Sequence, residues 1–374
     1  MPHIASSRMT TPLTLDLALQ GGGSRGIALN AAVIEILRRG HIIRRLVGTS
    51  AGAIVAAVVA AGLSVDELLR MGVVGTPDDL SLLSECVTEP LVPVAFDVDP
   101  VISEAQLTPL KLPAELGRRL LSAHAALGFV ERGGFISGEG FVGWLMRVLE
   151  GKERGLSRVT LGELHARTGC HLTVIVTDTT ARRLRALNHV SSPDCPLVSA
   201  VRMSISIPLF FTEVVWRAEW GSYAGEDLTG HVMVDGGVLS NLPIVFVMPS
   251  TNALVTRLMG PSLEGAAIPV GLVLDTTLEV PGAPPAPRTS SALGAISATR
   301  LGRRITALAD TMVNGMDLTV SDTASLRLCR LPVKGYGVTE FDMTQARADA
   351  LANAATVATA TYLDELEARS SEFP

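Results

Sequence analysis

The pentapeptide at positions 48–52, G-T-S-A-G, constrains the fold of this chain more than any other feature. It has the form G-x-S-x-G and lies between an apolar segment, Arg44–Val47, and a run of small residues, Ala51–Ala61. This order predicts a strand that turns directly into a helix, a tight turn that pushes Ser50 out toward solvent. Gly48 and Gly52 are required because a Cβ at either position would collide with neighbouring backbone. Since the helix N-terminus adds unpaired N–H groups beside the serine oxygen, Ser50 is a candidate nucleophile; the alternative is an ordinary small-residue turn.

The first sixty residues have the order of a βαβα unit. A strand is expected at Leu13–Leu19, followed by a glycine loop and a helix at Ile27–Arg39 whose apolar residues have helical spacing. The strand that leads to Ser50 comes next. A unit of this kind has parallel strands joined by a right-handed connection, which indicates the α/β class.

The rest of the chain predicts a single domain at 13–370, preceded by a flexible N-terminus at 1–12. Residues 64–140 carry several prolines and short helical segments, which predicts a helical insertion, either a lid or a peripheral layer. The other expected strands are His171–Thr177, His231–Val234, Ile268–Asp275 and Leu326–Leu331, and the expected helices are Pro113–Leu121, Gly140–Leu149, Leu197–Ser204, Ser291–Met316 and Met343–Glu367.

The composition excludes several classes of protein. With 374 residues, of which 47% are hydrophobic, the chain has enough apolar side chains for a large core. A net charge of -6 leaves no basic surface for nucleic acid. The clusters Arg182–Arg185 and Arg300–Arg304 are interpreted as solvated faces, with contact to anionic lipid head groups as the alternative. The cysteines form no C-x-x-C pair, which indicates reduced thiols rather than a zinc site or disulfides.

The sequence shows no targeting or membrane-spanning segment. Met1–Pro12 lacks the apolar core of a secretory signal. The longest apolar run, Ala51–Leu63, is too short to span a bilayer. We therefore expect a cytoplasmic protein, or an effector that is delivered without a leader.

The glycine loop Gly21–Gly26 admits two interpretations. Its form, G-x-G-x-x-G between a strand and a helix, also matches the dinucleotide-binding fingerprint, which requires an acidic residue at the end of the second strand. The second strand ends in Val47 and the serine turn instead. The other interpretation is an oxyanion hole, in which successive glycines present backbone N–H groups to a developing oxyanion. In this interpretation the hole comprises Gly21, Gly22, Gly23, Arg25 and Gly26, where Arg25 fixes the loop or meets an anionic head group.

A serine nucleophile requires a base that accepts the proton of its hydroxyl. None of the seven histidines follows Asp235, so the order serine, acid, histidine that G-x-S-x-G suggests is absent. A rearranged triad remains open, in which Asp178 or Asp194 pairs with His189 or His231. Asp235 ends a strand and precedes two glycines, and open α/β sheets place their chemistry at strand C-termini. Asp235 in direct contact with Ser50 would form a Ser–Asp dyad, and the alternative is an ordinary Asp-Gly turn.

These motifs, in this order, resemble those of the patatin-like phospholipase family. The glycine loop resembles the family's G-G-G-x-[K/R]-G block, and the pentapeptide resembles its nucleophile block. The resemblance continues through Thr177–Asp178 after a strand, Met203–Phe211 as the S-x-S-I-P-x-x-F block, Asp235–Pro243 as the D-G-[G/A]-x-x-x-N-x-P block, and Phe341–Asp342 before the last helix. Each motif is short, but together they cover most of the chain.

The resemblance implies a three-layer α/β/α sandwich with a mostly parallel, doubly wound sheet. It also implies hydrolysis of lipid esters through an acyl-enzyme, with Ser50 as nucleophile, Asp235 as base and neither a metal nor another cofactor. Gly48 and Gly52 would frame the nucleophile, and the two glycines Gly236 and Gly237 would follow the base. The expected partners are a lipid or phospholipid substrate and a transiently contacted membrane surface. The alternatives are a general carboxylesterase or thioesterase of the same fold and, from another class, a dinucleotide-binding or regulatory module.

Overall fold

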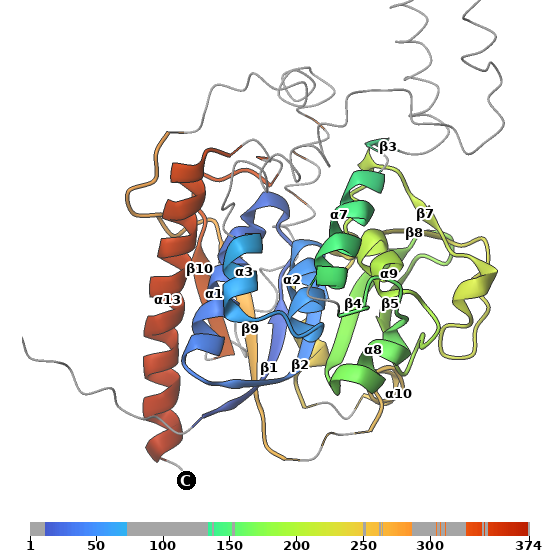
Figure 1. Cartoon of the computed structure of the whole chain (residues 1–374), viewed down its shortest axis with the longest axis horizontal. Helices are drawn as coiled ribbons and strands as arrows, with labels where there is room; N and C mark the ends of the chain where they lie inside the picture. Colours follow the sequence, from blue (N-terminus) through green and yellow to red (C-terminus); the bar gives the residue numbers. More distant parts are fainter. Residues whose placement is uncertain are drawn as a thin grey trace, which may run out of the picture.

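A computed structural model describes residues 12–72, 134–285 and 327–372, except for 137, 152–153, 250–251, 262, 264, 339 and 341–342, together with the single residues 304, 307 and 311. An eight-stranded mixed sheet, mostly parallel, forms the centre of this part of the chain (Figure 1). The strand order is β10-β9-β1-β2-β4-β8-β7, with β5 also paired to β4. These strands are β1 (Thr14–Leu19), β2 (Ile42–Thr49), β4 (His171–Asp178), β5 (Arg183–Asn188), β7 (Val214–Val215), β8 (Val232–Asp235), β9 (Ile268–Asp275) and β10 (Leu328–Pro332).

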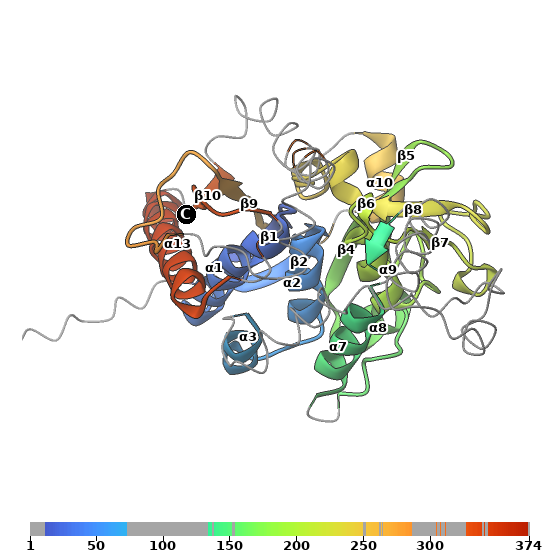
Figure 2. The ribbon, with the colours of Figure 1, turned by 90° about the horizontal axis from the view of Figure 1, so that it is seen from above.

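Helices pack on the sheet and complete the predicted α/β architecture. On one side α1 packs against α13, α2 and α3, while α2 and α9 lie on β4 (Figure 2). The short helix α10 lies on the other side of the sheet in the same view, and the segment η5 (Ile244–Phe246) packs there against β1 and β9. The helices are α1 (Gly26–Arg38), α2 (Ala51–Ala60), α3 (Val65–Gly72), α7 (Glu139–Glu150), α8 (Leu161–Thr168), α9 (Leu197–Ser204), α10 (Ala253–Met259) and α13 (Gln345–Glu372).

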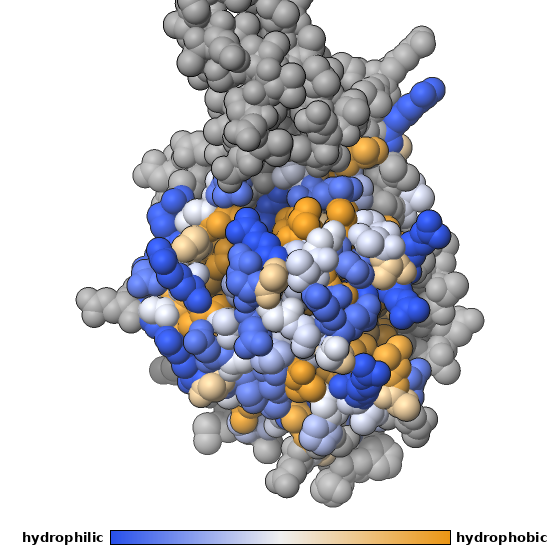
Figure 3. Space-filling model, turned by 90° about the vertical axis from the view of Figure 1, so that its right-hand side faces the viewer, coloured by the Kyte–Doolittle hydropathy of each residue, from blue (hydrophilic) through white to orange (hydrophobic). Residues whose placement is uncertain are grey.

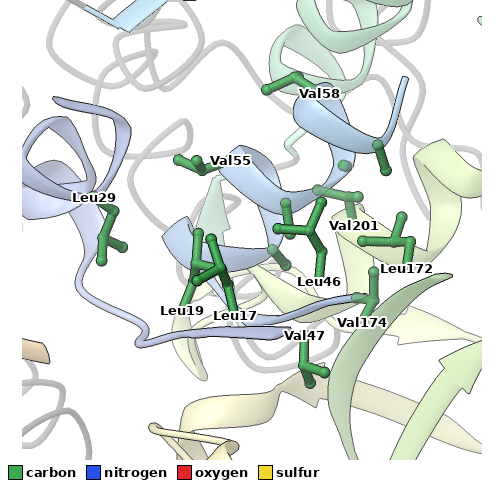
Figure 4. Packing of buried hydrophobic residues seen from close by; sticks show 14 of the residues in the cluster. Leu17, Leu19, Leu29, Leu46, Val47, Val55, Val58, Leu172, Val174 and Val201 are labelled. Atoms are coloured by element: carbon green, nitrogen blue, oxygen red, sulfur yellow. The ribbon is translucent and has the colours of Figure 1, made fainter. Parts of the chain in front are cut away.

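The core lies between the sheet and the helices of the first side. Leu17, Leu46 and Val174 of the central strands are fully buried, and they lie beneath Val58 of α2 and Val201 of α9 (Figure 4). Parallel strands that are covered on both faces have nearly continuous apolar sequences, as these do. Each large aliphatic side chain buried here contributes about 1.5–3 kcal/mol, so the core holds the strand ends that carry the site in fixed positions.

The predicted βαβα unit is confirmed. β1 and β2 pair in parallel and place Leu19 opposite Gly48. The helix Leu197–Ser204 and the strand Ile268–Asp275 have the predicted bounds, and the other predicted elements within the described residues differ by a few positions at their ends. The predicted helices Pro113–Leu121 and Ser291–Met316 lie largely outside the described residues, as do 1–11 and most of the proposed insertion 64–140, of which α3 forms the beginning. The domain boundaries stay a prediction.

The prediction for the cluster Arg182–Arg185 was wrong in part. These residues belong to the end of a turn and to β5, and Arg185 is buried although Arg182 and Arg183 are exposed. The Arg185 guanidinium donates to the carboxylate of Asp178 (Nη2–Oδ2, 2.8 Å) and to that of Glu226 (Nη1–Oε2, 2.7 Å). Asp178 ends the strand that pairs with β5, and Glu226 comes from a segment farther along the chain. The burial of Arg185 therefore depends on residues outside the arginine cluster.

The side of the molecule that carries β5, β7 and β8 shows hydrophilic and hydrophobic residues interspersed (Figure 3). The described atoms on this side form no single extended apolar area, a pattern that is usual for a globular surface. None of the helices in the described ranges has both the length and the apolar character needed to cross a bilayer.

Candidate active site

Two strands end against each other along one edge of β4, and each delivers a predicted catalytic side chain. β2 pairs in parallel with the first half of β4 and places Thr49 opposite Ile175. β8 pairs in antiparallel fashion just beyond, with Asp235 opposite Val176. Because β5 pairs along most of β4 and overlaps both registers, it must occupy the other edge. β2 and β8 therefore lie end to end, which brings Ser50 to Asp235.

Ser50 and Asp235 lie close together as expected, but for a different structural reason. We expected Asp235 at the carboxyl edge that parallel strands share, whereas β8 runs against β4. The strand stops at Asp235, at the level where β2 also stops, so its C-terminus still meets the serine turn. The two strand ends converge because they point toward each other.

The serine turn has the strained backbone that the G-x-S-x-G pattern predicts. Ser50 has φ 51° and ψ −123°, a backbone conformation that residues other than glycine rarely adopt. A Cβ at Gly48 would lie 2.4 Å from the carbonyl oxygen of Gly52, and a Cβ at Gly52 would lie 2.4 Å from that of Leu19. Only glycine fits at these two positions, so the turn packs directly against β1.

Ser50 is buried, with 5% of its surface exposed, whereas we expected it to point into solvent. The glycine loop accounts for part of this cover, because a Cβ at Gly21 would lie 3.1 Å from the Ser50 Cβ. The Ser50 N–H donates to the Ser204 hydroxyl (2.9 Å), which in turn donates to the carbonyl of Ile175 (2.7 Å). Ser204 thereby ties the serine turn to β4.

The carboxylate of Asp235 lies in a buried pocket of backbone. Its Oδ1 accepts a hydrogen bond from the Gly237 N–H (2.7 Å), and its own N–H donates to the carbonyl of Ser206 (2.9 Å). A Cβ at Gly236 would lie 2.3 Å from the Ile175 carbonyl oxygen, so the two glycines allow the chain to turn tightly over β4. The side chain is consequently held in one orientation.

Burial raises the pKa of Asp235 to about 7, although hydrogen bonds from the Ser50 hydroxyl and the Gly237 N–H oppose this effect. Among the described residues, Oδ2 has no hydrogen bond of ordinary geometry. The contact with the Ser50 hydroxyl is therefore loose in this state, as is common for catalytic pairs without substrate. A carboxylate with this pKa is suited to accept a proton near neutral pH.

The glycine loop lies beside Ser50, and two of its backbone N–H groups have no acceptor among the described residues. The Gly21 N–H donates to the carbonyl of Asn241 (3.1 Å), and the Asn241 amide donates back to the Gly21 carbonyl (3.1 Å). The N–H groups of Gly22 and Gly23 donate to none of the described residues. Gly23 has φ 56°, and a Cβ there would lie 2.1 Å from the carbonyl oxygen of Val338. The loop is thus fixed while two N–H groups stay available.

Arg25 and Gly26 support the loop from behind. The Arg25 side chain is buried, and its Nε donates to the carbonyl of Tyr336 (2.8 Å). A Cβ at Gly26 would lie 2.9 Å from the Ala51 Cβ, so this glycine lets α1 approach α2. Of the two roles that we considered for Arg25, the contact with Tyr336 favours fixing the loop.

None of the described histidines is hydrogen-bonded to Ser50, whose N–H and hydroxyl have Ser204 and Asp235 as partners. His231 Nδ1 lies 2.9 Å from Asp178 Oδ2, the pair that a rearranged triad requires. Asp178 also accepts from Arg185 and from the Ala181 N–H, and these contacts and His231 lower the pKa of Asp178 against the effect of its burial. His231 and Asp178 therefore form part of a structural ion-pair network.

Two supporting residues were not recognised from the sequence. Ser204 holds the Ser50 backbone, and Asn241 holds Gly21. Both were visible as letters in the S-x-S-I-P and N-x-P patterns, but neither had an assigned role. Both residues are far from their partners in the sequence, so these contacts form only when the chain folds.

The fold and the site define a class: an α/β protein whose strained serine turn meets a buried aspartate and a glycine loop. The sequence profile described as patatin-like phospholipase matches residues 17–248, more than half of the chain. The chain belongs to the patatin-like phospholipase family.

Several known proteins are similar to this chain. The uncharacterized protein YqhO of Bacillus subtilis (strain 168) is 28% identical over 239 residues, which are 62% of this chain and 65% of that protein. An uncharacterized protein of Acanthamoeba polyphaga mimivirus is 22% identical over 267 residues, 70% of this chain and 75% of the viral protein. The chain thus spans just under two thirds of the length of YqhO.

Two solved structures also match this chain. VipD from Legionella pneumophila has a TM-score of 0.46 and 16% identity, with 95% of this chain and 68% of VipD covered. The type III effector ExoU has a TM-score of 0.41 and 16% identity, with 96% of this chain and 54% of ExoU covered.

Proposed function

We propose that this protein is a lipid acyl hydrolase of the phospholipase A or lysophospholipase type, with Ser50 as nucleophile and Asp235 as base. The observation that carries the proposal is the end-to-end meeting of β2 and β8, which places the strained serine against a buried carboxylate. The pKa of that carboxylate, raised by burial to about 7, supports its role as the base.

In the first step the Ser50 hydroxyl attacks the ester carbonyl while its proton passes to Asp235. The oxyanion that develops on the carbonyl accepts hydrogen bonds from the N–H groups of Gly22 and Gly23. Each such donor contributes about 3–4 kcal/mol to transition-state stabilisation. Collapse of the intermediate breaks the ester bond, and Asp235 returns its proton to the departing alcohol.

In the second step the same groups release the fatty acid. A water molecule gives its proton to Asp235 and attacks the acyl-serine, with the oxyanion again on the glycine loop. Proton return to Ser50 frees the acid and restores the resting site. Apart from the substrate and this water, the groups in both steps are side chains and backbone N–H groups of this chain.

The substrate class follows from the family, whose description names phospholipases. A membrane lipid would reach the site during transient contact of the protein with a bilayer, in the cytoplasm or after delivery into another cell. The second candidate is a general carboxylesterase or thioesterase with the same dyad. Hydrolysis of soluble short-chain esters without hydrolysis of phospholipid vesicles would favour that second candidate.

The proposal is tested with the full chain and with two variants, Ser50→Ala and Asp235→Asn. We expect the wild type to hydrolyse phospholipid vesicles and p-nitrophenyl esters and both variants to lose nearly all of this activity. A fluorophosphonate probe should label the wild type at Ser50, while the control variant Ser240→Ala, which removes a serine close in sequence to Asp235, should keep the label. Equal turnover by the wild type and both variants would refute the proposal. Tight NAD(P) binding without labelling of Ser50 would support the dinucleotide-binding alternative instead.

A further inference from the structure

Three histidines from three elements gather at the end of β4 that is remote from the candidate active site. His165 lies on α8, His171 begins β4, and His189 follows the last residue of β5. Ring centroids are 3.8 Å apart for His165 and His189, 4.6 Å for His165 and His171, and 5.1 Å for His171 and His189. The cluster lies about 13 Å along the strand from Ile175, at about 3.3 Å per residue.

The ring nitrogens of this cluster are close enough to act together. One nitrogen of each of the three rings lies within 4.8 Å of the other two, and all three side chains are half-buried. A half-buried position leaves the cluster open to ions from solvent and restricts the rings enough to limit the entropy lost on binding.

The hydrogen bonds of the cluster leave nitrogen lone pairs available. His165 Nδ1 lies 3.0 Å from the carbonyl oxygen of Cys170. Because a carbonyl only accepts, Nδ1 carries the proton and the Nε2 lone pair is free. A ring nitrogen bonded to a backbone carbonyl is the arrangement that orients histidine ligands in metal sites. His189 Nδ1 is buried and has no hydrogen-bond partner among the described residues, which gives a second nitrogen without a competing contact.

The distances favour zinc after a small adjustment. Zinc binds imidazole nitrogens at about 2.0–2.1 Å in a tetrahedron, which sets the ligand nitrogens about 3.4 Å apart. The nitrogens here are separated by up to 4.8 Å, and a small rotation of the half-buried rings would bring them to this spacing. Arg45 lies opposite His171 on β2, and its charge opposes a cation. Its Nη1 donates to the carbonyl of Phe246 (3.3 Å), and the carboxylate of Asp16, opposite Arg45 on β1, is ion-paired with Arg44 (2.6 Å).

We propose that His165, His171 and His189 form a binding site for a divalent transition metal, most suitably Zn²⁺, with water as the fourth ligand. Imidazole nitrogens are suitable ligands for Zn²⁺ and for other divalent transition metals. The bound ion would join α8 to the β4–β5 hairpin. The site is independent of the proposed catalysis, because it lies at the opposite end of β4.

The test is a titration of the full metal-free chain with Zn²⁺ by isothermal calorimetry at neutral pH. We expect one Zn²⁺ per chain and a rise in melting temperature on binding. Loss of a residue that merely supports a metal ligand weakens binding by about 10–100-fold, so His165→Ala and His189→Ala should each weaken it by at least about 100-fold. The matched control is His231→Gln, which removes an imidazole elsewhere on the protein and should leave the affinity unchanged.

Two outcomes would overturn the proposal. One is the absence of saturable binding of one Zn²⁺ per chain by the wild type. The other is equal affinity in the wild type and the cluster variants. If a variant does not fold, Co²⁺ absorption spectra of the wild type decide: bands of tetrahedral cobalt that disappear on addition of Zn²⁺ support the site, and spectra of hydrated cobalt alone refute it.

Discussion

The substitution Asp235→Asn is predicted to stabilise the folded protein at neutral and alkaline pH while it abolishes hydrolysis. Asp235 is a buried carboxylate whose Oδ2 lacks a well-formed hydrogen bond among the described residues. Its ionised form is therefore held in the fold at the expense of stability, as is common at functional sites. Asparagine has the same shape, and its carbonyl oxygen still accepts the Gly237 N–H.

The size of the effect follows from the pKa. Burial raises the pKa of Asp235 from 3.8 to about 7, and at about 1.4 kcal/mol per pKa unit the ionised side chain lowers the free energy of unfolding by about 4 kcal/mol above pH 7. The penalty is absent below pH 3.8, grows as pH rises toward 7 and is complete above it, because the unfolded chain ionises first. The shift to about 7 already includes the hydrogen bond from Gly237, and protonated Asp235 is a neutral acceptor, as asparagine is. The gain for Asp235→Asn is therefore about 4 kcal/mol at pH 8 and close to zero at pH 4.

The assay is thermal unfolding of the wild type and Asp235→Asn between pH 4 and pH 8. We expect the melting temperature of the variant to exceed that of the wild type at pH 8 and the difference to vanish at pH 4. The control is Asp349→Asn, which replaces an exposed aspartate on α13. A variant that is less stable than the wild type at pH 8, or a difference that does not change with pH, would refute the burial argument.

Three further predictions concern the site. The kcat/KM of ester hydrolysis should rise with pH as Asp235 ionises, with an apparent pKa of about 7; a profile that is flat between pH 5 and 8 would count against this base. Ser204→Ala leaves the N–H of Ser50 without its buried acceptor, a loss that costs about 1–3 kcal/mol. Steady-state kinetics should therefore show kcat reduced about 10–100-fold with KM little changed. An unchanged kcat would exclude a positioning role for Ser204. Gly48→Ala inserts a Cβ 2.4 Å from a carbonyl oxygen and should destabilise the fold by about 3 kcal/mol, as measured by denaturant unfolding. The matched control is Gly143→Ala on α7, where the nearest neighbour of the new Cβ would lie at an ordinary 3.5 Å. Equal stabilities of Gly48→Ala and the wild type would contradict the packing argument.

Much of the fold was predictable because its strongest patterns are local. The strand–loop–helix–strand order of the first sixty residues depends on hydrophobic spacing and glycine, both of which act within a few residues. β5 and α8 were missed for a different reason. The arginines of β5 mask its alternation, and the burial of Arg185 depends on Asp178 and Glu226 from other segments. The direction of β8 depends on its pairing with β4, which its four residues do not encode.

The candidate site was predictable in its residues but not in its surroundings. Ser50 and Asp235 are each marked by adjacent glycines, and the structure brings the two together. The burial of Ser50 and the contact with Ser204 arise only when distant segments pack. The histidine cluster was not predicted either, because His165 on α8 contacts His189 only when α8 packs on the β4–β5 hairpin.

Capture of the acyl-enzyme would identify the nucleophile of the proposed reaction directly. The wild type and Ser50→Ala are quenched in acid during turnover of a phospholipid with one defined acyl chain, digested, and examined by mass spectrometry. We predict that the wild-type peptide containing Ser50 gains the mass of that acyl group and that Ser50→Ala forms no adduct. An adduct on another residue, or continued turnover by Ser50→Ala, would rule out Ser50 as the nucleophile.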